Sequence, residues 1–337
     1  MLPENLDLIL TACQHRQPLV EENPEGAYRL FTGFHEGFPH LVIDRFHHTL
    51  VFYDYTPEGN LSGPLVEELT ARLQEIYPDT YTIVLKVRNS TQAELRNGVL
   101  IQGDKSDTWI RENGIRYAID LQMNQDASFY LDTRNLRKWL IENSAGKTVL
   151  NTFAYTGTLG IAAIAGGARK VIQTDMNRNF LNIAKTSCSL NGFVIRKQDY
   201  INGDFFRVIT RLKKEGKLFD TVILDPPFFS DTDAGRVDIV NEYNRLLNKV
   251  RPLVAHNGTL IAINNALFLS GAAYMAQLEQ LCKTNYLFLG ERIDIPKDSV
   301  GYAQFSQAST STDPAPFNHS TKIIRLHVQR KDGKIST

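Results

Sequence analysis

The stretch from Thr148 to Asp175 constrains the fold of this 337-residue chain more than any other. An apolar, β-branched run at 148–153 has the composition of a buried parallel strand. A turn containing Gly157, a small apolar helix at 159–165 and a second strand at 170–174 follow, and Asp175 ends that strand. This order predicts a βαβ unit of a doubly wound α/β sheet, where ligands bind beyond the carboxyl ends of the strands. An acid there is placed to accept hydrogen bonds from two ribose hydroxyls. We therefore expect a nucleoside-containing cofactor, although an ordinary βαβ unit can also end in a glycine turn and an acid.

The glycines of the turn distinguish between nucleoside cofactors. A dinucleotide site needs three closely spaced glycines, so that the backbone can approach a pyrophosphate. The run 154–160 contains only Gly157 and Gly160. Because S-adenosylmethionine (SAM) carries no phosphate, this spacing favours SAM over NAD.

Length and composition set the outer limits. The length predicts two domains, which we place at 1–115 (small, α+β) and 116–337 (Rossmann-like, mostly parallel with an antiparallel last strand). The chain has no apolar run long enough to span a membrane, and its first residues lack a signal-peptide layout. Its cysteines, Cys13, Cys188 and Cys282, are far apart, and its histidines have no further ligands at metal spacing. These features predict a cytoplasmic protein with reduced thiols, no membrane contact and no metal.

The charge is unevenly distributed. Residues 1–115 hold nine basic and seventeen acidic side chains, whereas residues 116–337 hold 28 and 20. This asymmetry favours a polyanionic partner for the second part, and mutual attraction of the two domains explains it equally well.

A second motif follows the predicted apolar strand 219–224, in Asp225-Pro226-Pro227-Phe228-Phe229. The two prolines exclude a helix and stiffen an extended corner. The Asp225 carboxylate and the Pro226 carbonyl can then act as acceptors in the cleft. Phe228 offers a flat face for base stacking, worth about 1–3 kcal/mol. Alone this motif is a common turn, but after a SAM-type βαβ unit it predicts a site for a planar nitrogen heterocycle.

Other strand ends and loops carry weaker signals. Asp204 follows a short predicted strand, and we expect it to bind adenine, to cap the helix 205–214, or both. Asp132 is a fair cap for a helix that ends near Gly146, and the polar, aromatic segment 122–137 could cover a ligand. The segments 230–236 and 296–321 are predicted loops, the first of them mobile over the substrate. Asn264 and Asn265 end a fifth strand at 259–263, after a turn at 256–258.

The order of these parts resembles class I SAM-dependent ribosomal RNA large-subunit methyltransferases. This group includes the cytosine-modifying methyltransferase I and the K half of the K/L guanine methyltransferase. The similar motifs are Phe129-Tyr130-Leu131-Asp132-Thr133-Arg134, Asn151-Thr152-Phe153-Ala154-Tyr155-Thr156-Gly157, Asp175, Asp204, Asp225-Pro226-Pro227-Phe228 and the glycine-rich entry 33–45. The resemblance covers residues from about 28 to the C-terminus. It implies that these motifs bind the cofactor, through Tyr130, Asp132, Arg134, Asn151, Phe153, Tyr155, Thr156, Gly157, Asp175, Met176, Asp204 and Asp225. It further implies that Asp225, Pro226, Phe228 and Asn264 act on the target base.

The sequence departs from the cytosine-modifying members in two ways. The short stretch before the matching region leads us to expect no RNA-binding PUA domain. Where those members have a cysteine nucleophile near the end of the fifth strand, this chain has Ile263-Asn264-Asn265. Carbon-5 of cytosine needs such a nucleophile, whereas a ring or exocyclic nitrogen attacks the methyl group directly.

We therefore expect a SAM-dependent methyltransferase acting on a base nitrogen of ribosomal or other structured RNA. The alternatives are cytosine-C5 methylation, an NAD-dependent oxidoreductase, and a non-catalytic RNA-binding protein. The oligomeric state stays open, with a homodimer as one alternative.

Overall fold

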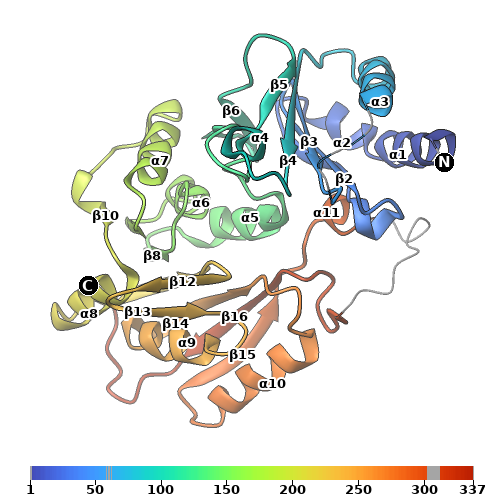
Figure 1. The fold of residues 1–337 in the computed structure, drawn as a ribbon. Coiled ribbons are helices and arrows are strands. Elements are labelled where there is room, and N and C mark those ends of the chain that lie inside the picture. Colours follow the sequence, from blue (N-terminus) through green and yellow to red (C-terminus); the bar gives the residue numbers. More distant parts are fainter. Residues whose placement is uncertain (1, 58, 60, 62, 302–311, 337) are drawn as a thin grey trace. The chain divides into compact units, whose positions relative to one another are not determined.

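The computed structural model describes residues 2–57, 59, 61, 63–301 and 312–336. The chain forms two compact units, Met1–Asp132 with Pro296–Thr310, and Thr133–Ile295 with Ser311–Thr337. The division lies later than the predicted boundary between residues 115 and 116, and a late segment of the chain returns to the first unit. Figure 1 shows the course of the chain through both units.

The first unit is built on a five-stranded sheet in the order β1-β2-β3-β4-β5, in which only β3 and β4 are parallel. Its strands are β1 (Ala27–Phe31), β2 (Leu41–Phe46), β3 (Thr49–Asp54), β4 (Thr82–Val87) and β5 (Val99–Gln102). Its helices are α1 (Leu2–His15), α2 (Gln17–Glu22), η1 (Gly33–Glu36), α3 (Gly63–Ile76), α4 (Ala93–Asn97) and α11 (Lys297–Val300). A hairpin of β6 (Trp109–Glu112) and β7 (Ile115–Ala118) turns at Asn113-Gly114, as the sequence predicts. Leucines of α1 and α3 pack against the sheet and form the core of this unit.

A buried polar cluster attaches α11 to the first unit. Arg16 forms an ion pair of 3.0 Å with Glu36, and both side chains are fully buried. The Arg16 guanidinium also donates to the Asp298 carbonyl (2.9 Å), and the Asp298 carboxylate accepts from the backbone N–H of Arg29 (3.2 Å). The predicted loop 296–321 is therefore wrong at its start, where residues 297–300 are helical. Residues 302–311 of that loop lie outside the described part of the chain.

The second unit is a seven-stranded sheet in the order β10-β9-β8-β11-β14-β16-β15. Its strands are β8 (Thr148–Thr152), β9 (Lys170–Asp175), β10 (Tyr200–Asn202), β11 (Phe219–Leu224), β14 (Val254–Asn264), β15 (Leu287–Arg292) and β16 (Lys322–Val328). Only β16 runs against the others, because both β14 and β15 pair with it in antiparallel register. The expected Rossmann-like sheet with an antiparallel last strand is confirmed.

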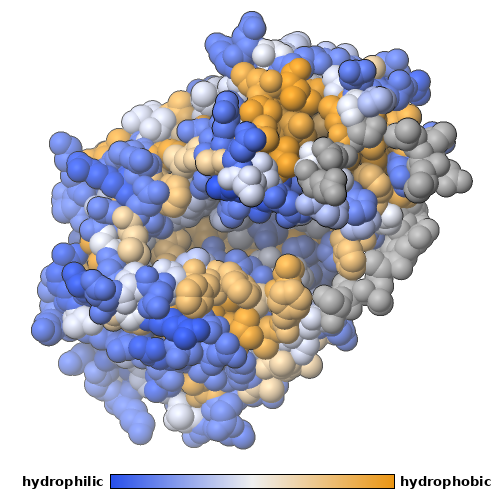
Figure 2. Space-filling view, in the orientation of Figure 1, coloured by the Kyte–Doolittle hydropathy of each residue, from blue (hydrophilic) through white to orange (hydrophobic). Residues whose placement is uncertain are grey.

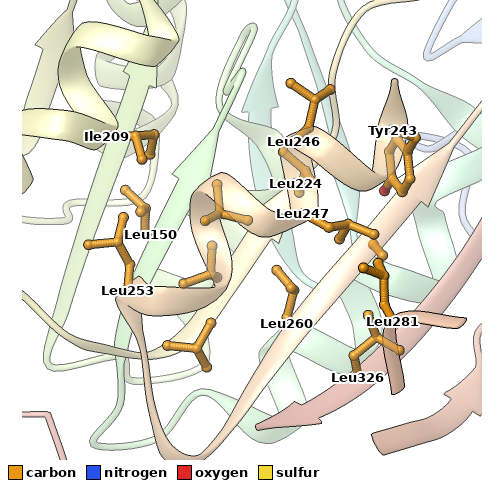
Figure 3. Packing of buried hydrophobic residues seen from close by; sticks show 14 of the residues in the cluster. Leu150, Ile209, Leu224, Tyr243, Leu246, Leu247, Leu253, Leu260, Leu281 and Leu326 are labelled. Atoms are coloured by element: carbon orange, nitrogen blue, oxygen red, sulfur yellow. The ribbon is translucent and has the colours of Figure 1, made fainter. Parts of the chain in front are cut away.

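Helices cover this sheet in two groups. The first group is α5 (Arg134–Asn143), α6 (Thr158–Ala165) and α7 (Arg178–Leu190), which pack together and against β8 and β9. The second group is α8 (Phe205–Lys214), α9 (Tyr243–Val250) and α10 (Gly271–Cys282). Three short 3-10 turns lie outside these groups: η2 (Leu131–Thr133), η3 (Lys197–Asp199) and η4 (Arg251–Leu253). Side chains of the second group and the sheet form the large core, of which Figure 3 labels Ile209, Leu224, Leu247 and Leu260.

The strand order reverses between β8 and β11. From β8 the chain moves to β9 and β10 on one side, and β11 and β14 lie on the other. Thr152 pairs with Leu224 across this point, so the turn after β8 and the corner after β11 leave the sheet side by side. In open α/β sheets this crevice is where ligands bind.

Three local predictions are wrong. Residues 230–236 are not an irregular loop, because β12 (Phe229–Thr232) and β13 (Gly235–Asp238) form a hairpin there; the predicted mobility stays a prediction. The predicted turn 256–258 lies inside β14, where the pairing with β11 shifts register and Asn257 takes a positive φ of 60°. Asp132 lies in η2, and the cap of α5 is Thr133.

Candidate active site

The turn after β8 has an unusual backbone. Phe153, Tyr155 and Gly157 have φ values of 53°, 53° and 77°. Three hydrogen bonds hold this path: Ala154 N–H to the Thr174 carbonyl (2.9 Å), Tyr155 N–H to Asp175 Oδ2 (2.8 Å), and Gly157 N–H to the Ala154 carbonyl (2.8 Å). A non-glycine residue in this region costs roughly 1–3 kcal/mol, and such strain concentrates at functional sites. The turn is thus a rigid structure bonded to the end of β9.

Gly157 is required by both its backbone and its surroundings. Its φ of 77° favours glycine, and an added Cβ would lie 2.4 Å from Ala184 Cβ and 2.6 Å from Gln173 Oε1. A Cβ added at Gly160 would also lie too close to Gln173. Because Gly160 has no side chain, α6 can lie flat on β9.

We predict that Gly157→Ala lowers the free energy of unfolding by about 2–4 kcal/mol, from positive-φ strain and overpacking together. Chemical denaturation monitored by circular dichroism measures the change. Gly146→Ala is the matched control, since Gly146 also has a positive φ (70°) but nothing lies within 4 Å of its added Cβ. Equal losses in the two variants would contradict a packing role for Gly157.

Asp175 ends β9 and faces the turn. Its carboxylate accepts from Tyr155 N–H and Asn177 N–H, each at 2.8 Å. Burial raises the pKa of this carboxyl group, and the backbone N–H groups of Asn177, Tyr155 and Met176 oppose that shift. A carboxylate has about four lone-pair positions, so these N–H groups leave room for a further donor such as a ribose hydroxyl. The neighbouring Met176 is 56% exposed.

Asp204 follows β10, which pairs with β9 through Asn202 and Asp175. Its Oδ1 accepts from the Arg207 N–H (3.0 Å), so the predicted cap of α8 is confirmed. Its Oδ2 lies 2.7 Å from the Thr232 hydroxyl, which joins the 229–238 hairpin to the start of α8. Its role toward adenine stays a prediction.

The corner after β11 presents an acid and aromatic rings. Asp225 is half-buried, Pro226 is buried, and Phe228 is 51% exposed. Ile239 N–H donates to the Phe228 carbonyl (3.4 Å), which fixes the corner to the base of the hairpin. The charge of Asp225 contributes to raising the pKa of the buried Tyr243, after burial itself and Tyr274. An exposed ring and a half-buried carboxylate on one short corner suit a planar, hydrogen-bonding ligand.

Asn264 occupies a different position from the one its predicted role requires. It is fully buried, its amide N–H donates to the Ile239 carbonyl (3.0 Å), and its Oδ1 accepts from the Ala266 N–H (3.0 Å). These bonds connect the end of β14 to the hairpin base and so to Phe228. This geometry favours a positioning role for Asn264. The neighbouring Asn265 is exposed to solvent.

Leu267 and Phe268 are candidates that the sequence reasoning missed. They follow β14, which neighbours β11, and are 59% and 72% exposed. Phe229 in the hairpin is 52% exposed, and the guanidinium carbon of Arg236 lies over its ring, 5.0 Å from the ring centroid. The available signal was the apolar pair at 267–268, which follows the asparagines and Ala266 in the sequence.

The remaining predicted cofactor residues are spread over both units. Asn151 and Thr156 are buried, and Phe153 stacks on Phe205 at 4.5 Å between centroids. Arg134 begins α5 in the second unit. Tyr130 and Asp132 belong to the first unit, where the Tyr130 hydroxyl donates to Asp126 (3.2 Å). Their roles at the cofactor stay predictions.

Lys86 orders the segment that contains Tyr130. Its buried ammonium group donates to the carbonyls of Asn97 (2.7 Å), Asn124 (2.7 Å) and Asp126 (3.0 Å). Burial lowers the pKa of Lys86 to about 7, despite the opposing charge of Asp126. This lysine was also missed, because a lone lysine in a strand gives no sequence signal.

None of the three cysteines lies at the corner after β11 or at the end of β14. Cys13 is in α1, Cys188 is in α7, and Cys282 ends α10. Burial raises the pKa of all three thiols, that of Cys13 to about 12. Across the described residues, no group of three histidines, cysteines or carboxylates could hold a metal ion. No helix in the same part of the chain is long and apolar enough to cross a membrane.

The sheet order, the reversal between β8 and β11 and the acid at the end of β9 define a Rossmann-like fold of the class I methyltransferase type. The chain belongs to the S-adenosylmethionine-dependent methyltransferase family, whose model matches residues 66–302.

Individual proteins are similar to this chain in sequence or in fold. The ribosomal RNA large subunit methyltransferase I of Aeromonas salmonicida is 30% identical over 255 residues, covering 74% of this chain and 63% of that protein. The chain thus spans less than two thirds of that relative. A crystal structure of a proposed methyltransferase with SAH has a TM-score of 0.82 at 22% identity, covering 97% of this chain and 82% of that one. A tRNA methyltransferase from M. jannaschii has a TM-score of 0.57 at 14% identity, covering 97% and 79%.

Proposed function

We propose that this enzyme methylates a ring or exocyclic nitrogen of a base in ribosomal or other structured RNA. The observation that carries the proposal is the pairing of Thr152 with Leu224 at the strand reversal. It brings the SAM-type turn and the Asp-Pro-Pro-Phe corner to one edge of one sheet. The named relative that acts on ribosomal RNA supports the substrate class.

The residues at this edge fit SAM. The turn at 153–157 lacks the third glycine that a pyrophosphate site needs, which suits a ligand without phosphate. Asp175 keeps an acceptor position for a ribose hydroxyl. The predicted contacts are the methionine part along 151–157, the ribose at Asp175 and the adenine at Asp204. When bound, the cofactor supplies an electrophilic methyl group.

The protein's own contribution is positioning and charge complementarity. Asp225 and the Pro226 carbonyl accept hydrogen bonds from the base edge, and Phe228 stacks on its face. Asn264 keeps the hairpin base and the Phe228 carbonyl in place. A base within a duplex would have to leave its stack to reach this corner.

The cysteine positions favour a nitrogen over carbon-5 of cytosine. Methylation at carbon-5 requires a thiolate beside the base. The three thiols lie in α1, in α7 and at the end of α10, and their raised pKa values disfavour the thiolate form.

Calorimetry and RNA methylation test the proposal. We expect micromolar SAM affinity and no binding of NAD. With tritiated SAM, we expect methyl transfer to large-subunit ribosomal RNA from a strain that lacks the gene, and none to RNA from the parent strain. Nucleoside mass spectrometry then identifies the product. A 5-methylcytidine product, or transfer only to protein, would overturn the proposal.

A further inference from the structure

The second unit carries a basic groove of about 470 Å³ between α8, α9 and the turn of the hairpin. We call this cleft the basic groove; its lining includes Arg207, Arg211, Lys214, Arg245, Lys249 and the ring of Phe206. None of its lining side chains is acidic. Figure 2 shows mainly hydrophilic residues over α8.

The cations form two rows. Arg207, Arg211 and Lys214 recur at helical spacing on α8, and Arg245 and Lys249 lie one turn apart on α9. Each row repeats about every 5.4 Å along its helix axis. Two rows of positive charge facing one cleft match a chain of phosphates better than a single anion.

Much of this charge is free of carboxylate partners. Arg211 and Arg245 form exposed ion pairs with Glu215 (3.7 Å) and Glu242 (2.8 Å). Exposed pairs of this kind are worth about 0–1 kcal/mol and give way to a stronger anion. Among the described residues, Arg207, Lys214 and Lys249 have no ion-pair partner. Outside the groove lining, burial and then the charge of Lys249 lower the pKa of Lys213 on α8.

The groove starts at the candidate active site. Arg207 lies in the first turn of α8, whose cap Asp204 contacts Thr232 of the hairpin at 2.7 Å. At the hairpin turn, Gly235 lies so close to Phe206 that an added Cβ would be 2.6 Å from the ring. The Arg245 guanidinium lies 5.7 Å from the centroid of that ring. The hairpin thus connects the Asp225–Phe228 corner directly to the mouth of the groove, and Lys214 and Lys249 lie at its far end.

We propose that the basic groove binds the phosphate backbone of the RNA strand that leads away from the target base. The inference rests on the proposed function. Backbone contacts of this type fix register and affinity without reading sequence. The hairpin, which separates the groove from the base-binding corner, would then set the number of nucleotides between the two.

The test compares a variant that lacks two groove cations with a variant that lacks two cations at the opposite edge of the sheet. The groove variant is Arg211→Gln/Lys249→Gln. The matched control is Arg169→Gln/Lys170→Gln, which removes the same charge from a second basic cleft at the amino ends of β8 and β9. Binding is measured by fluorescence polarisation with a uridine 20-mer and by filter binding with large-subunit ribosomal RNA, over a salt series. SAM affinity is measured by calorimetry, and poly-glutamate serves as the acidic protein probe.

For the groove variant we expect RNA affinity to fall at least tenfold near 0.1 M salt. The slope of log affinity against log salt should become shallower by about 1.4, because each single-strand phosphate that the protein no longer neutralises reduces it by about 0.7. SAM affinity and melting temperature should stay at the wild-type values, and the control variant should bind RNA as the wild type does. Equal RNA binding by wild-type and groove variant, equal losses of RNA affinity in both variants, or a loss confined to poly-glutamate would overturn the groove assignment. Failure of the wild-type enzyme to methylate RNA would instead overturn the proposed function.

Discussion

Asp225→Ala is expected to lower kcat for RNA methylation by about 10²–10³-fold, the scale of removing one preorganised hydrogen-bonding group. The prediction follows from the corner after β11, where the prolines fix the backbone and Ile239 N–H anchors the Phe228 carbonyl at 3.4 Å. With the backbone held, loss of the carboxylate removes an acceptor without moving the stacking ring. A nitrogen nucleophile that loses this acceptor is less electron-rich and less well oriented.

Single-turnover methylation with saturating RNA and SAM measures this effect. Asp225→Asn should retain part of the activity, since it keeps one oxygen acceptor but not the charge. The control is Asp231→Asn, an exposed carboxylate in the hairpin opposite Arg236, for which we expect a change of less than threefold. Thermal melts of all variants confirm folding. Wild-type kcat in Asp225→Ala would exclude this carboxylate from the mechanism.

The elements that follow local rules were predictable from the sequence. The buried strands at 148–152, 170–175 and 219–224 are short apolar or β-branched runs, and the structure has them within one residue of the predicted ends. Gly157 has the positive φ that its place in the turn requires. Asp204 caps α8 because an acid before an amphipathic run is the ordinary start of a helix. The relative placement of the two motifs also follows from the parallel order of strands.

What the sequence could not show depends on contacts far apart in the chain. The segment 229–238 has the composition of a loop, and its hairpin is held by Asp204 on Thr232 and by Phe206 against Gly235. The four-residue helix α11 is too short to form alone, and its anchors Arg16 and Arg29 lie near the opposite end of the chain. Similarly, the Asn264 amide, which was predicted to act on the base, donates its hydrogen bond to the Ile239 carbonyl. The basic groove was not predicted either, because its two rows of cations lie on separate helices, α8 and α9, that only the fold brings together.

Asp175→Ala is expected to weaken SAM affinity about 100-fold, from lost hydrogen bonds to a charged acceptor at about 1.5 kcal/mol each. The same substitution leaves Tyr155 N–H and Asn177 N–H without their acceptor, which loosens the turn at 153–157. Calorimetry with SAM measures the loss. Glu279→Ala removes an exposed carboxylate from α10 and should bind SAM as the wild type does.

The pH dependence of binding gives a sharper test of the same carboxylate. Burial raises the pKa of Asp175 above its ordinary value, so the group takes up a proton at a higher pH in the folded protein than in the unfolded chain. Its charge therefore costs stability above that pKa, and the cost is relieved as pH falls through it. SAM binding, which needs the carboxylate as acceptor, should run the opposite way and weaken as pH falls through the same value. In Asp175→Ala this acid-side loss of affinity should disappear, leaving weak binding that is independent of pH over that range. An unchanged acid-side profile in the variant would mean that another group, and not Asp175, governs cofactor binding.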